Sequence, residues 1–502
     1  MKCFSFKGLT KILCLFLAIT VFMVGCGKKI TPTSGSSGDS SQASQTDGLT
    51  STETSGSEST KETTSTASSS IGSNTTTKTK KPTTVSKIST TTKREVDLKG
   101  RVIKIGSVYG EEYNQEIGKS PYSDLFRQKE KEIENKFNCK IQYSRIAPDS
   151  CESIIANAVK AGEAPYDLVE CDIASARNLA RSKTLLDQKT LKSLKLNDKR
   201  FIKAVNDSFT FNGKVYGSGF ENLSITGVLF NKRIIREKKQ PDIYKLYDEG
   251  KWTFEAFEQI AKATTSPYKP DKTRDVYGIT GSTNIMGLAL TSNAGATVSR
   301  NKSGKYIIDM ALEKGVYAMN WCRKLMFEDG SYDYSGTDWK SAVNRFAEGK
   351  ATFLPFYAWI ARDLSRTMVD DIGFVAFPKG PGQNTYINSL YGGKAYVFPK
   401  TVKNPEDIAK VYYELASASS QLWNVIEKQY KGWGFDDKSF EIFRDLAEKY
   451  SRPEYSVGPD YSGFSRDMND SVFKRTGNPA SVMASVKSKF QKATDDYYKE
   501  FS

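Results

Sequence analysis

Histidine is absent from this chain of 502 residues. Its absence excludes catalysis by a Ser-His-Asp or Cys-His group, a zinc site built on His-Glu-x-x-His, and any metal site that needs an imidazole ligand. A reaction on this chain would have to use carboxylates, lysine, tyrosine or cysteine. We expect a protein that is not an enzyme, has no catalytic residue, and uses neither a cofactor nor a metal.

Cysteine is scarce, and its spacing is irregular. Seven cysteines occur in the chain, of which Cys139, Cys151, Cys171 and Cys322 lie beyond the first hundred residues. They form neither a CxxC pair nor a disulfide framework. Single buried thiols are the expected state of these four, and one incidental disulfide is the alternative.

Long apolar runs are also missing, except for one near the amino terminus. Residues 12–24 form this run, which follows a lysine-rich segment and is too short for a comfortable membrane span. It ends in Met-Val-Gly-Cys, which resembles a bacterial lipobox with Met in place of the usual Leu. We expect a lipoprotein signal peptide at 1–25 and a diacyl lipid, such as palmitate, on Cys26. An ordinary secretory peptide and a retained helical anchor are the alternatives.

Aliphatic residues are rare in the segment that follows. Within residues 26–97, the stretch 31–92 consists mostly of Ser and Thr, and such a segment cannot bury enough apolar area to offset its ordering entropy. We expect a disordered tether that connects a lipid-anchored Cys26 to a folded part. Together these features place the protein on the extracellular face of a cytoplasmic membrane.

Beyond the tether, apolar periodicity predicts an α/β protein. Strand patterns at 102–107, 139–143 and 166–171 alternate with helical patterns at 122–137 and 151–161, which is the order of parallel βαβ units. More units of this kind follow, and the last part of the chain has mainly helical patterns. About 400 residues exceed one ordinary core, so we expect two lobes with a ligand between them, beside the carboxyl ends of strands.

Four segments in the expected folded part carry a family resemblance. They are Gly-Lys-Val-Tyr-Gly at 213–217 with Gly-Val-Leu-Phe-Asn-Lys at 227–232, Trp-Thr-Phe-Glu-Ala-Phe at 252–257, Phe-Ala-Glu-Gly-Lys-Ala-Thr-Phe at 346–353, and 372–382 with Gly-Gly-Lys-Ala-Tyr-Val at 392–397. In this order, and behind a lipobox, they resemble the extracellular solute-binding lipoproteins of ABC importers, in the sugar-binding family 1 that includes maltose-binding protein. The resemblance covers 99–502. One departure is Ser-Gly-Phe-Glu at 218–221, where the family often has proline and an aromatic residue.

The resemblance implies a two-lobed, periplasmic-binding-protein-like fold with a hinge and an interlobe ligand cleft. The expected amino-terminal lobe comprises 99–222 plus 396–448, and the expected carboxy-terminal lobe comprises 223–395 plus 449–502. The chain would cross between the lobes near 221–224, 394–398 and 447–455. Closure of the hinge around a ligand would produce the state that a permease recognises.

Sugar binding requires aromatic faces for the apolar side of the ring and planar polar side chains for its hydroxyls. Residues of these kinds lie after expected strands or at the expected crossings. The ligand-binding candidates are Tyr109, Glu111, Asp172, Glu221, Asn222, Ser224, Tyr357, Trp359, Tyr391, Gly392 and Trp433. The resemblance supports Trp359 and Trp433, because the family places cleft aromatics nearby. Each candidate has a structural alternative, such as a helix cap for Asp172 or lobe core for the tryptophans.

These features predict a monomeric, lipid-anchored protein that captures a sugar or oligosaccharide and delivers it to the permease subunits of an ABC importer. The lipid anchor would be its only contact with the membrane. The net charge is +15, but neither an Arg-rich block nor an RNA-binding signature accompanies it, so we expect no nucleic-acid partner. Two alternatives stay open. One is a ligand-sensing or adhesion lipoprotein on the same fold, and the other is a secreted glycosidase with carboxylates from Glu111, Glu112, Asp172 or Glu221.

Overall fold

The computed structural model describes part of the chain. The described residues are 96–110, 118, 120–221, 223–281, 284–333, 338–459 and 478–501, and all of them belong to one compact unit. The expected signal peptide, Cys26 and nearly all of the expected tether lie outside them. Within the described part, no helix combines the length and the apolarity that a membrane span requires.

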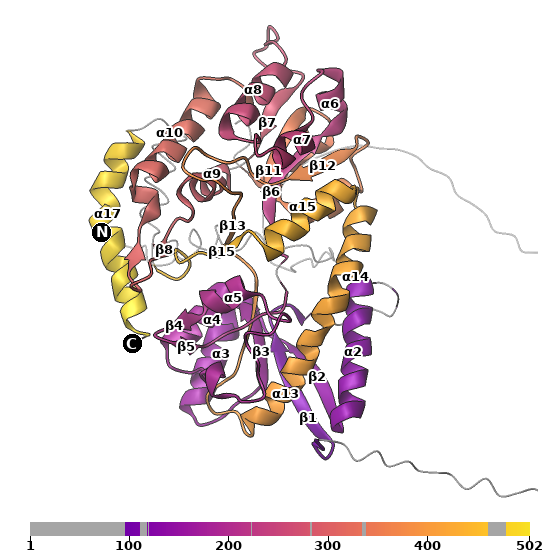
Figure 1. The fold of residues 1–502 in the computed structure, drawn as a ribbon, viewed down its shortest axis with the longest axis vertical. Helices are drawn as coiled ribbons and strands as arrows, with labels where there is room; N and C mark the ends of the chain where they lie inside the picture. The colour runs from indigo at the N-terminus through magenta and orange to yellow at the C-terminus, as the bar shows by residue number, and fades with distance from the viewer. Residues whose placement is uncertain are drawn as a thin grey trace, which may run out of the picture. The chain divides into compact units, whose positions relative to one another are not determined.

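The first sheet has four strands in the order β14–β3–β1–β2 (Figure 1). The strands are β1 (Arg101–Ser107), β2 (Cys139–Arg145), β3 (Leu168–Asp172) and β14 (Lys394–Val397). β1 is parallel to β2 and β3, as the βαβ pattern predicts. β14 arrives from a distant part of the chain and is antiparallel to β3.

The second sheet has five strands in the order β10–β7–β11–β6–β12. The strands are β6 (Thr226–Asn231), β7 (Tyr277–Thr280), β10 (Tyr332–Asp333), β11 (Ala351–Tyr357) and β12 (Ile372–Val375). β6 is antiparallel to both of its neighbours. Each sheet is therefore mixed, because β14 and β6 enter from crossing segments instead of from a βαβ unit.

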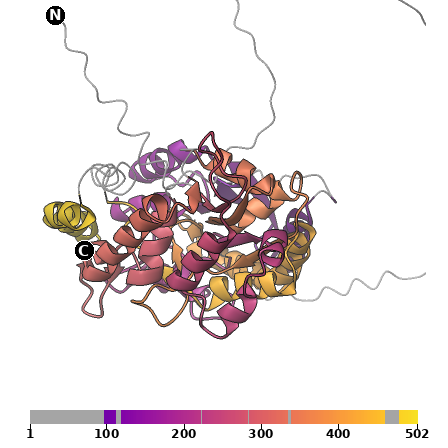
Figure 2. The same cartoon turned by 90° about the horizontal axis from the view of Figure 1, so that it is seen from above.

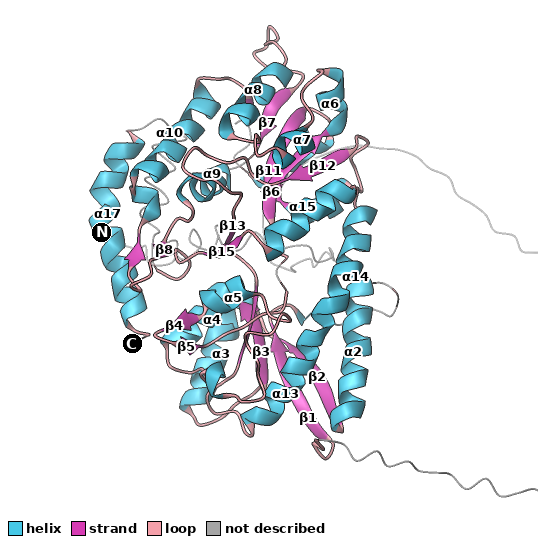
Figure 3. Cartoon of the chain, in the orientation of Figure 1, coloured by secondary structure: helices cyan, strands magenta, loops and turns pink. Residues whose placement is uncertain are grey.

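Helices enclose both sheets. In the first lobe, α3 and α4 lie on one side of the strands and α2 and α13 on the other (Figure 3). The helices are α2 (Pro121–Phe137), α3 (Pro148–Lys160), α4 (Ile173–Arg181), α5 (Lys203–Ser208), α6 (Lys232–Glu237), α7 (Ile243–Asp248), α8 (Phe254–Thr264), α9 (Asn284–Ala294), α10 (Glu313–Phe327), α11 (Trp339–Ala347), α12 (Ala361–Leu364), α13 (Pro405–Leu415), α14 (Ser419–Gly432), α15 (Asp437–Glu448) and α17 (Pro479–Lys499), with short 3-10 turns η2 (Gln188–Thr190), η3 (Asp309–Ala311), η4 (Ala358–Ile360) and η5 (Ala416–Ala418).

Three small two-stranded sheets complete the described fold. They pair β4 (Thr210–Phe211) with β5 (Lys214–Val215), β8 (Ser299–Arg300) with β9 (Tyr306–Ile307), and β13 (Asn388–Leu390) with β15 (Ser451–Pro453). The first pair adjoins α5 in the first lobe. The β8–β9 hairpin packs against α17, which also contacts α10 in the second lobe. In Figure 2, α17 is the yellow helix at the margin of the ribbon.

The chain passes between the sheets at two places close to those expected. The first passage runs from Ser218, which still forms a bridge with Tyr396 of β14, to Thr226 at the start of β6. The second runs from the end of β13 to Lys394 at the start of β14. It therefore lies just before the expected segment 394–398.

The boundary expected at 448 requires a correction. Helix α15 was assigned to the first lobe, but it packs against β12 of the second sheet. The Ser439 hydroxyl accepts a hydrogen bond from the backbone N–H of Phe374 at 2.9 Å, and the Phe374 and Phe435 rings stack at 5.2 Å. Helix α14 packs against α2 of the first lobe and ends at Gly432. The chain thus returns to the second lobe at the end of α14, because the apolar face of α15 covers β12.

Candidate ligand-binding site

In each sheet, the strand ends on one side face the segments that connect the lobes. We call these rows of strand ends the first edge and the second edge, after the sheet to which they belong. In the first sheet, this edge carries Asp172 at the end of β3, which is paired with Lys394 at the start of β14. In the second sheet, it carries Tyr357 at the end of β11, which is paired with Thr226 at the start of β6. Two of the connecting segments therefore begin at one edge and finish at the other, which brings candidate residues from both lobes to the same junction.

Lys394 is the centre of a buried polar cluster beneath the first edge. Its Nζ lies 2.9 Å from Glu221 Oε1, 3.1 Å from the Tyr122 hydroxyl and 3.6 Å from Glu170 Oε1. The same ammonium lies 5.0 Å from the centroid of the Tyr109 ring, which is within range of a cation–π interaction. The carboxylate side chains are 0% and 2% exposed. One cation therefore compensates two desolvated acids, which would otherwise be very costly to bury.

Hydroxyl groups extend this cluster. The Tyr122 hydroxyl donates to Glu221 Oε2 at 2.7 Å, and the Ser107 hydroxyl donates to Glu170. The backbone N–H of Tyr109 donates in turn to Ser107 Oγ at 2.9 Å. This network holds Tyr109 and Glu221, two of the predicted ligand residues, in a single arrangement.

The second edge is aromatic. The rings of Tyr357 and Trp359 are stacked with centroids 6.4 Å apart, and Trp359 meets Phe356 and Trp339 edge-on at 5.8 and 6.3 Å. Burial raises the pKa of Tyr357. The indole N–H of Trp359 is buried and has no hydrogen-bond acceptor among the described residues. An unpaired buried donor costs free energy, and a ligand hydroxyl that accepted this hydrogen bond would remove the cost.

The second connecting segment lies directly against the first. A Cβ atom on Gly392 would lie 2.8 Å from Ser224 Oγ, so the two segments approach closely at this point. The adjacent Tyr391 hydroxyl contacts the Thr297 hydroxyl and lies 3.5 Å from that of Thr291. Burial raises the pKa of Tyr391 well above its usual value. Ser224, Tyr391 and Gly392 thus belong to the junction as the sequence predicts, although the Tyr391 hydroxyl already has partners in the second lobe.

Asp172 lies on the first edge and also caps α4. Its carboxylate accepts hydrogen bonds from the backbone N–H and the hydroxyl of Ser175, at 3.0 and 2.7 Å. Its structural alternative is therefore realised, while a ligand contact stays a prediction. Glu111 and Asn222 lie outside the described residues.

Trp433 is the described candidate that the structure does not bring to the junction. It ends α14, and its ring packs on Tyr430 at 4.8 Å. A Cβ on the next residue, Gly434, would lie 3.5 Å from Ile372. Because β12 begins at Ile372 and runs antiparallel to β6, this is the end of the sheet opposite to Tyr357. A ligand at the junction would lie far from Trp433.

Sequence reasoning missed the residues beneath the first edge, namely Lys394, Glu170 and Tyr122. Glu170 did leave a signal, because it interrupts an otherwise apolar strand pattern, and a buried acid requires a partner. Lys394 left none, since a lysine at the start of a strand is typical of a solvated position. Only the pairing of β14 with β3 places its ammonium between two carboxylates.

The arrangement is suited to binding. The two acids that come together, Glu170 and Glu221, are buried and share one lysine, whereas a glycosidase needs two carboxyl groups that face the substrate. Among the described residues, no group of three or more Cys, Asp or Glu is placed to hold a metal ion. Aromatic rings from one lobe and a network of planar polar groups from the other are the features of a solute-binding junction.

Solved structures show the class of fold to which this junction belongs. A cyclo/maltodextrin-binding protein in complex with maltotetraose aligns with a TM-score of 0.57 and 17% identity, over 80% of this chain and 97% of its own. The GacH receptor of Streptomyces glaucescens, studied with acarbose, aligns with a TM-score of 0.55 and 15% identity. This alignment covers 79% of this chain and 99% of the receptor. UgpB from Mycobacterium tuberculosis, in complex with glycerophosphocholine, aligns with a TM-score of 0.54 and 14% identity. This alignment covers 78% of this chain and 98% of UgpB. The chain therefore has the two-lobed fold of periplasmic-binding-protein-like proteins.

The family follows from the sequence itself. Residues 130–430 match the family described as bacterial extracellular solute-binding protein. This match spans more than half of the chain, and the protein belongs to that family. No curated protein sequence matches it.

Proposed function

We propose that this protein captures a sugar or oligosaccharide between its two lobes and delivers it to the permease of an ABC importer. The observation that carries the proposal is the junction itself. Tyr109 and Glu221 from the first lobe and Tyr357 and Trp359 from the second lie at the strand ends beside the segments that connect the lobes. Stacking faces and planar polar groups together suit a sugar ring and its hydroxyls.

Maltotetraose and acarbose in the similar structures support a carbohydrate as the solute. Glycerophosphocholine in another shows that the same fold accepts a solute with a phosphate and a quaternary amine. The indole N–H of Trp359, which has no acceptor in the described part of the chain, and the aromatic second edge favour a sugar over a strongly anionic solute. The acids near the first edge point the same way, because two buried carboxylates, Glu170 and Glu221, lie there.

The proposal is tested by the thermal shift of the purified chain with a panel of mono- and oligosaccharides that includes maltotetraose and acarbose. A solute at 100 times its Kd adds about 2.7 kcal/mol to the free energy of unfolding, which raises Tm by several degrees. We expect at least one saccharide to do so, and we expect Trp359→Ala to abolish the shift.

Trp423→Ala is the matched control. Trp423 is also half-buried, but it packs edge-on against Phe440 and Phe443 at 6.3 and 6.2 Å, on the α14–α15 face. This variant should lose intrinsic stability and retain the saccharide shift. An equal loss of the thermal shift in both variants would contradict the assignment of Trp359 to the site. If no saccharide of the panel raised the Tm of the wild type, a sugar as the solute would be contradicted.

Delivery to a permease requires the protein to stay at the membrane, and we propose that the lipidated Cys26 anchors it there. Replacement of Cys26 by alanine is expected to move the protein from the membrane fraction to the culture medium. Intact mass measurement of the membrane-bound form should show a diacyl modification on residue 26 after removal of 1–25. Membrane retention of the alanine variant would contradict the anchor.

A further inference from the structure

Two of the four buried cysteines lie against each other inside the first lobe. Cys151 lies near the start of α3, and Cys171 is the residue before the last of β3. Both residues are 0% exposed. A side-chain hydrogen bond between the two thiols, together with burial, raises the pKa of Cys171 well above its usual value. The contact therefore joins a helix to the strand that this helix covers.

The fold directs these two side chains toward each other. Successive side chains of a strand point to opposite faces of its sheet, and Glu170 precedes Cys171 in β3. The Glu170 carboxylate accepts a hydrogen bond from the Tyr396 hydroxyl at 3.0 Å, and the Tyr396 ring lies 5.0 Å from that of Tyr412 in α13. Cys171 thus faces the other side of the sheet, which α3 and α4 cover (Figure 3). Cys151 is one of the buried residues of α3.

The other two cysteines lie elsewhere in the fold. Cys139 starts β2, at the end of the first sheet opposite to Cys171. Cys322 belongs to α10 in the second lobe. Of the four, Cys151 and Cys171 therefore come nearest to the geometry that a disulfide requires, because their thiols are already in contact.

We propose that Cys151 and Cys171 are joined by a disulfide bond in the mature protein outside the cell. The family to which the chain belongs is extracellular, and disulfides form and persist in oxidising compartments. The bond closes a loop of about twenty residues, which restricts the unfolded chain. It also holds the start of α3 against the strand that ends in Asp172, one of the ligand-binding candidates.

The bond forms by two exchanges with an external disulfide, such as that of a thiol oxidoreductase outside the cell. The thiolate of one cysteine attacks the external disulfide, which gives a mixed disulfide and releases one thiolate of the oxidant. The thiolate of the second cysteine then attacks the mixed disulfide and releases the other thiolate. The cysteine pair thereby loses two protons and two electrons, and the oxidant ends as two thiols.

Burial decides when this exchange takes place. In the folded chain both thiols are inaccessible, and the raised pKa of Cys171 keeps its thiol protonated. Exchange requires an accessible thiolate, so oxidation precedes the packing of α3 onto the sheet. Once this packing is complete, the same burial protects the bond from external reductants.

Differential alkylation of the full chain, exported by a bacterial host, tests the pair. The protein is unfolded without reductant, alkylated with iodoacetamide, and digested with trypsin for mass spectrometry. Trypsin cleaves after Lys160, between the two cysteines, so the bond joins two peptides. We expect Cys139 and Cys322 to be alkylated at once, and the joined peptides of Cys151 and Cys171 to react only after reduction. Alkylation of Cys151 and Cys171 before reduction would overturn the proposal, as would a bond from either of them to another cysteine.

Thermal unfolding measures the consequence of the bond for stability. A reductant present throughout the scan should lower the Tm of the wild type by several degrees. It should leave the Tm of Cys151→Ala unchanged, and Cys322→Ala should respond as the wild type does. An equal response of the wild type and Cys151→Ala to the reductant would contradict the bond.

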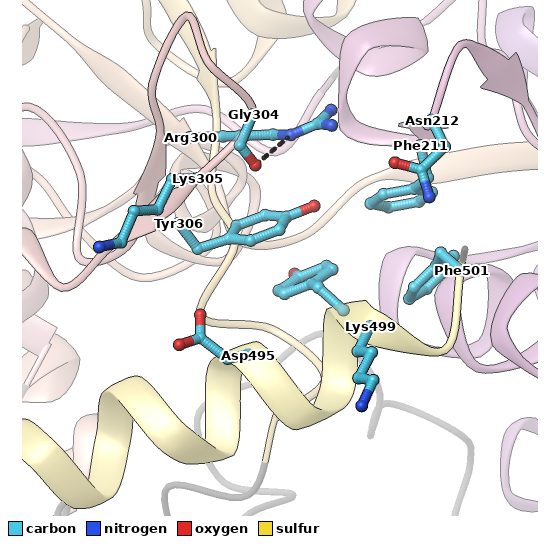
Figure 4. A pocket seen from close by; sticks show the side chains of 10 residues that line it. Phe211, Asn212, Arg300, Gly304, Lys305, Tyr306, Asp495, Lys499 and Phe501 are labelled. Carbon is cyan, nitrogen blue, oxygen red and sulfur yellow. Dashed lines mark hydrogen bonds between the residues drawn. The ribbon is translucent and has the colours of Figure 1, made fainter.

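Phe501→Ala is the control for a general loss of stability. Phe501 follows α17, and its ring lies 4.0 Å from that of Phe211 in β4, beside the cavity drawn in Figure 4. This variant should unfold at a lower temperature than the wild type because it loses buried aromatic contacts. Its Tm should still fall on reduction, and its alkylation pattern should equal that of the wild type. Loss of the response to reductant in Phe501→Ala would show that this response does not report on the cysteine pair.

Discussion

At the scale of single residues, Lys394 is the position at which charge and burial conflict most directly. Its ammonium compensates Glu221 and Glu170, which are almost fully buried. Replacement by methionine removes this ammonium from two buried acids, and breaking a buried pair in this way costs about 3–5 kcal/mol. We expect Lys394→Met to lower the free energy of urea unfolding by about that amount.

Lys203→Met is the matched control for this prediction. Lys203 pairs with Asp207, but its side chain is 85% exposed, and an exposed pair contributes little. The double variant Lys394→Met with Glu221→Gln should recover part of the lost stability, because one of the two charges is then removed. If the double variant recovered no stability, Lys394 would stabilise the fold through the aliphatic part of its side chain alone.

Glu130 predicts a pH dependence of stability. Burial, against the opposing hydrogen bond of Tyr143, raises the pKa of Glu130 from 4.5 to about 7. The folded protein then holds this proton over a range in which the unfolded chain has lost it. Stability from this group is therefore complete below about pH 4.5 and declines as the pH rises to about 7.

Glu130→Gln should remove this decline. Relative to wild type, the variant is expected to gain about 2–3 kcal/mol in free energy of unfolding at pH 8, with no comparable gain at pH 4. Urea titrations at several pH values measure the difference. Glu132→Gln, in the same helix, is the control of opposite sign, because hydrogen bonds from Lys129 and Gln128 lower the pKa of Glu132. If the difference in free energy of unfolding between Glu130→Gln and the wild type did not change with pH, the raised pKa of Glu130 would be refuted.

At the scale of secondary-structure elements, the first turn of α15 decides which lobe receives it. The Asp436 carboxylate caps the helix through the N–H of Ser439 at 2.7 Å. It also contacts Lys232 Nζ at 2.7 Å and the Tyr244 hydroxyl at 2.9 Å, both in the second lobe. Against the opposing effect of burial, the Lys232 ammonium and the Ser439 bonds lower the pKa of Asp436.

Asp436→Ala should therefore lower the free energy of unfolding by more than the removal of an ordinary helix cap does. We expect a loss of about 3 kcal/mol, of which the cap accounts for about 1. Asp338→Ala removes the exposed cap of α11, whose partners among the described residues are the adjoining Lys340 and Ser341, and it should cost about 1 kcal/mol. Equal losses in chemical unfolding would show that the contacts of Asp436 with α6 and α7 are energetically neutral.

Local elements were predicted well because their causes are local. Thr253 caps α8 through the N–H of Ala256, and Gly349 takes a positive φ just after α11, as their residue types indicate. The side of the molecule on which an element packs has no such local cause. α15 is amphipathic whichever sheet it covers, so its apolar pattern carries no information that could correct the lobe implied for it by the resemblance.

At the scale of the whole molecule, the two-lobed fold predicts closure around a solute. A saccharide that raises Tm should also reduce the radius of gyration measured by small-angle X-ray scattering. Trp359→Ala should show no reduction, because it lacks the aromatic face of the second edge, while Trp423→Ala should respond as the wild type does. An unchanged radius with a bound saccharide would indicate lobes that are already closed, or a ligand bound to one lobe alone.

The sequence by itself determined the α/β class, the order of most helices and strands, and several residues of the junction. These follow from apolar periodicity, caps and turns, which act over a few residues and are written in the chain. Tertiary structure alone decided the antiparallel entry of β14 and β6, the placement of Lys394 between two acids, the distance of Trp433 from the junction, and the contact of Phe501 with Phe211. Each of these depends on strand pairing or packing between segments that are far apart in the chain, and no local pattern encodes such a register.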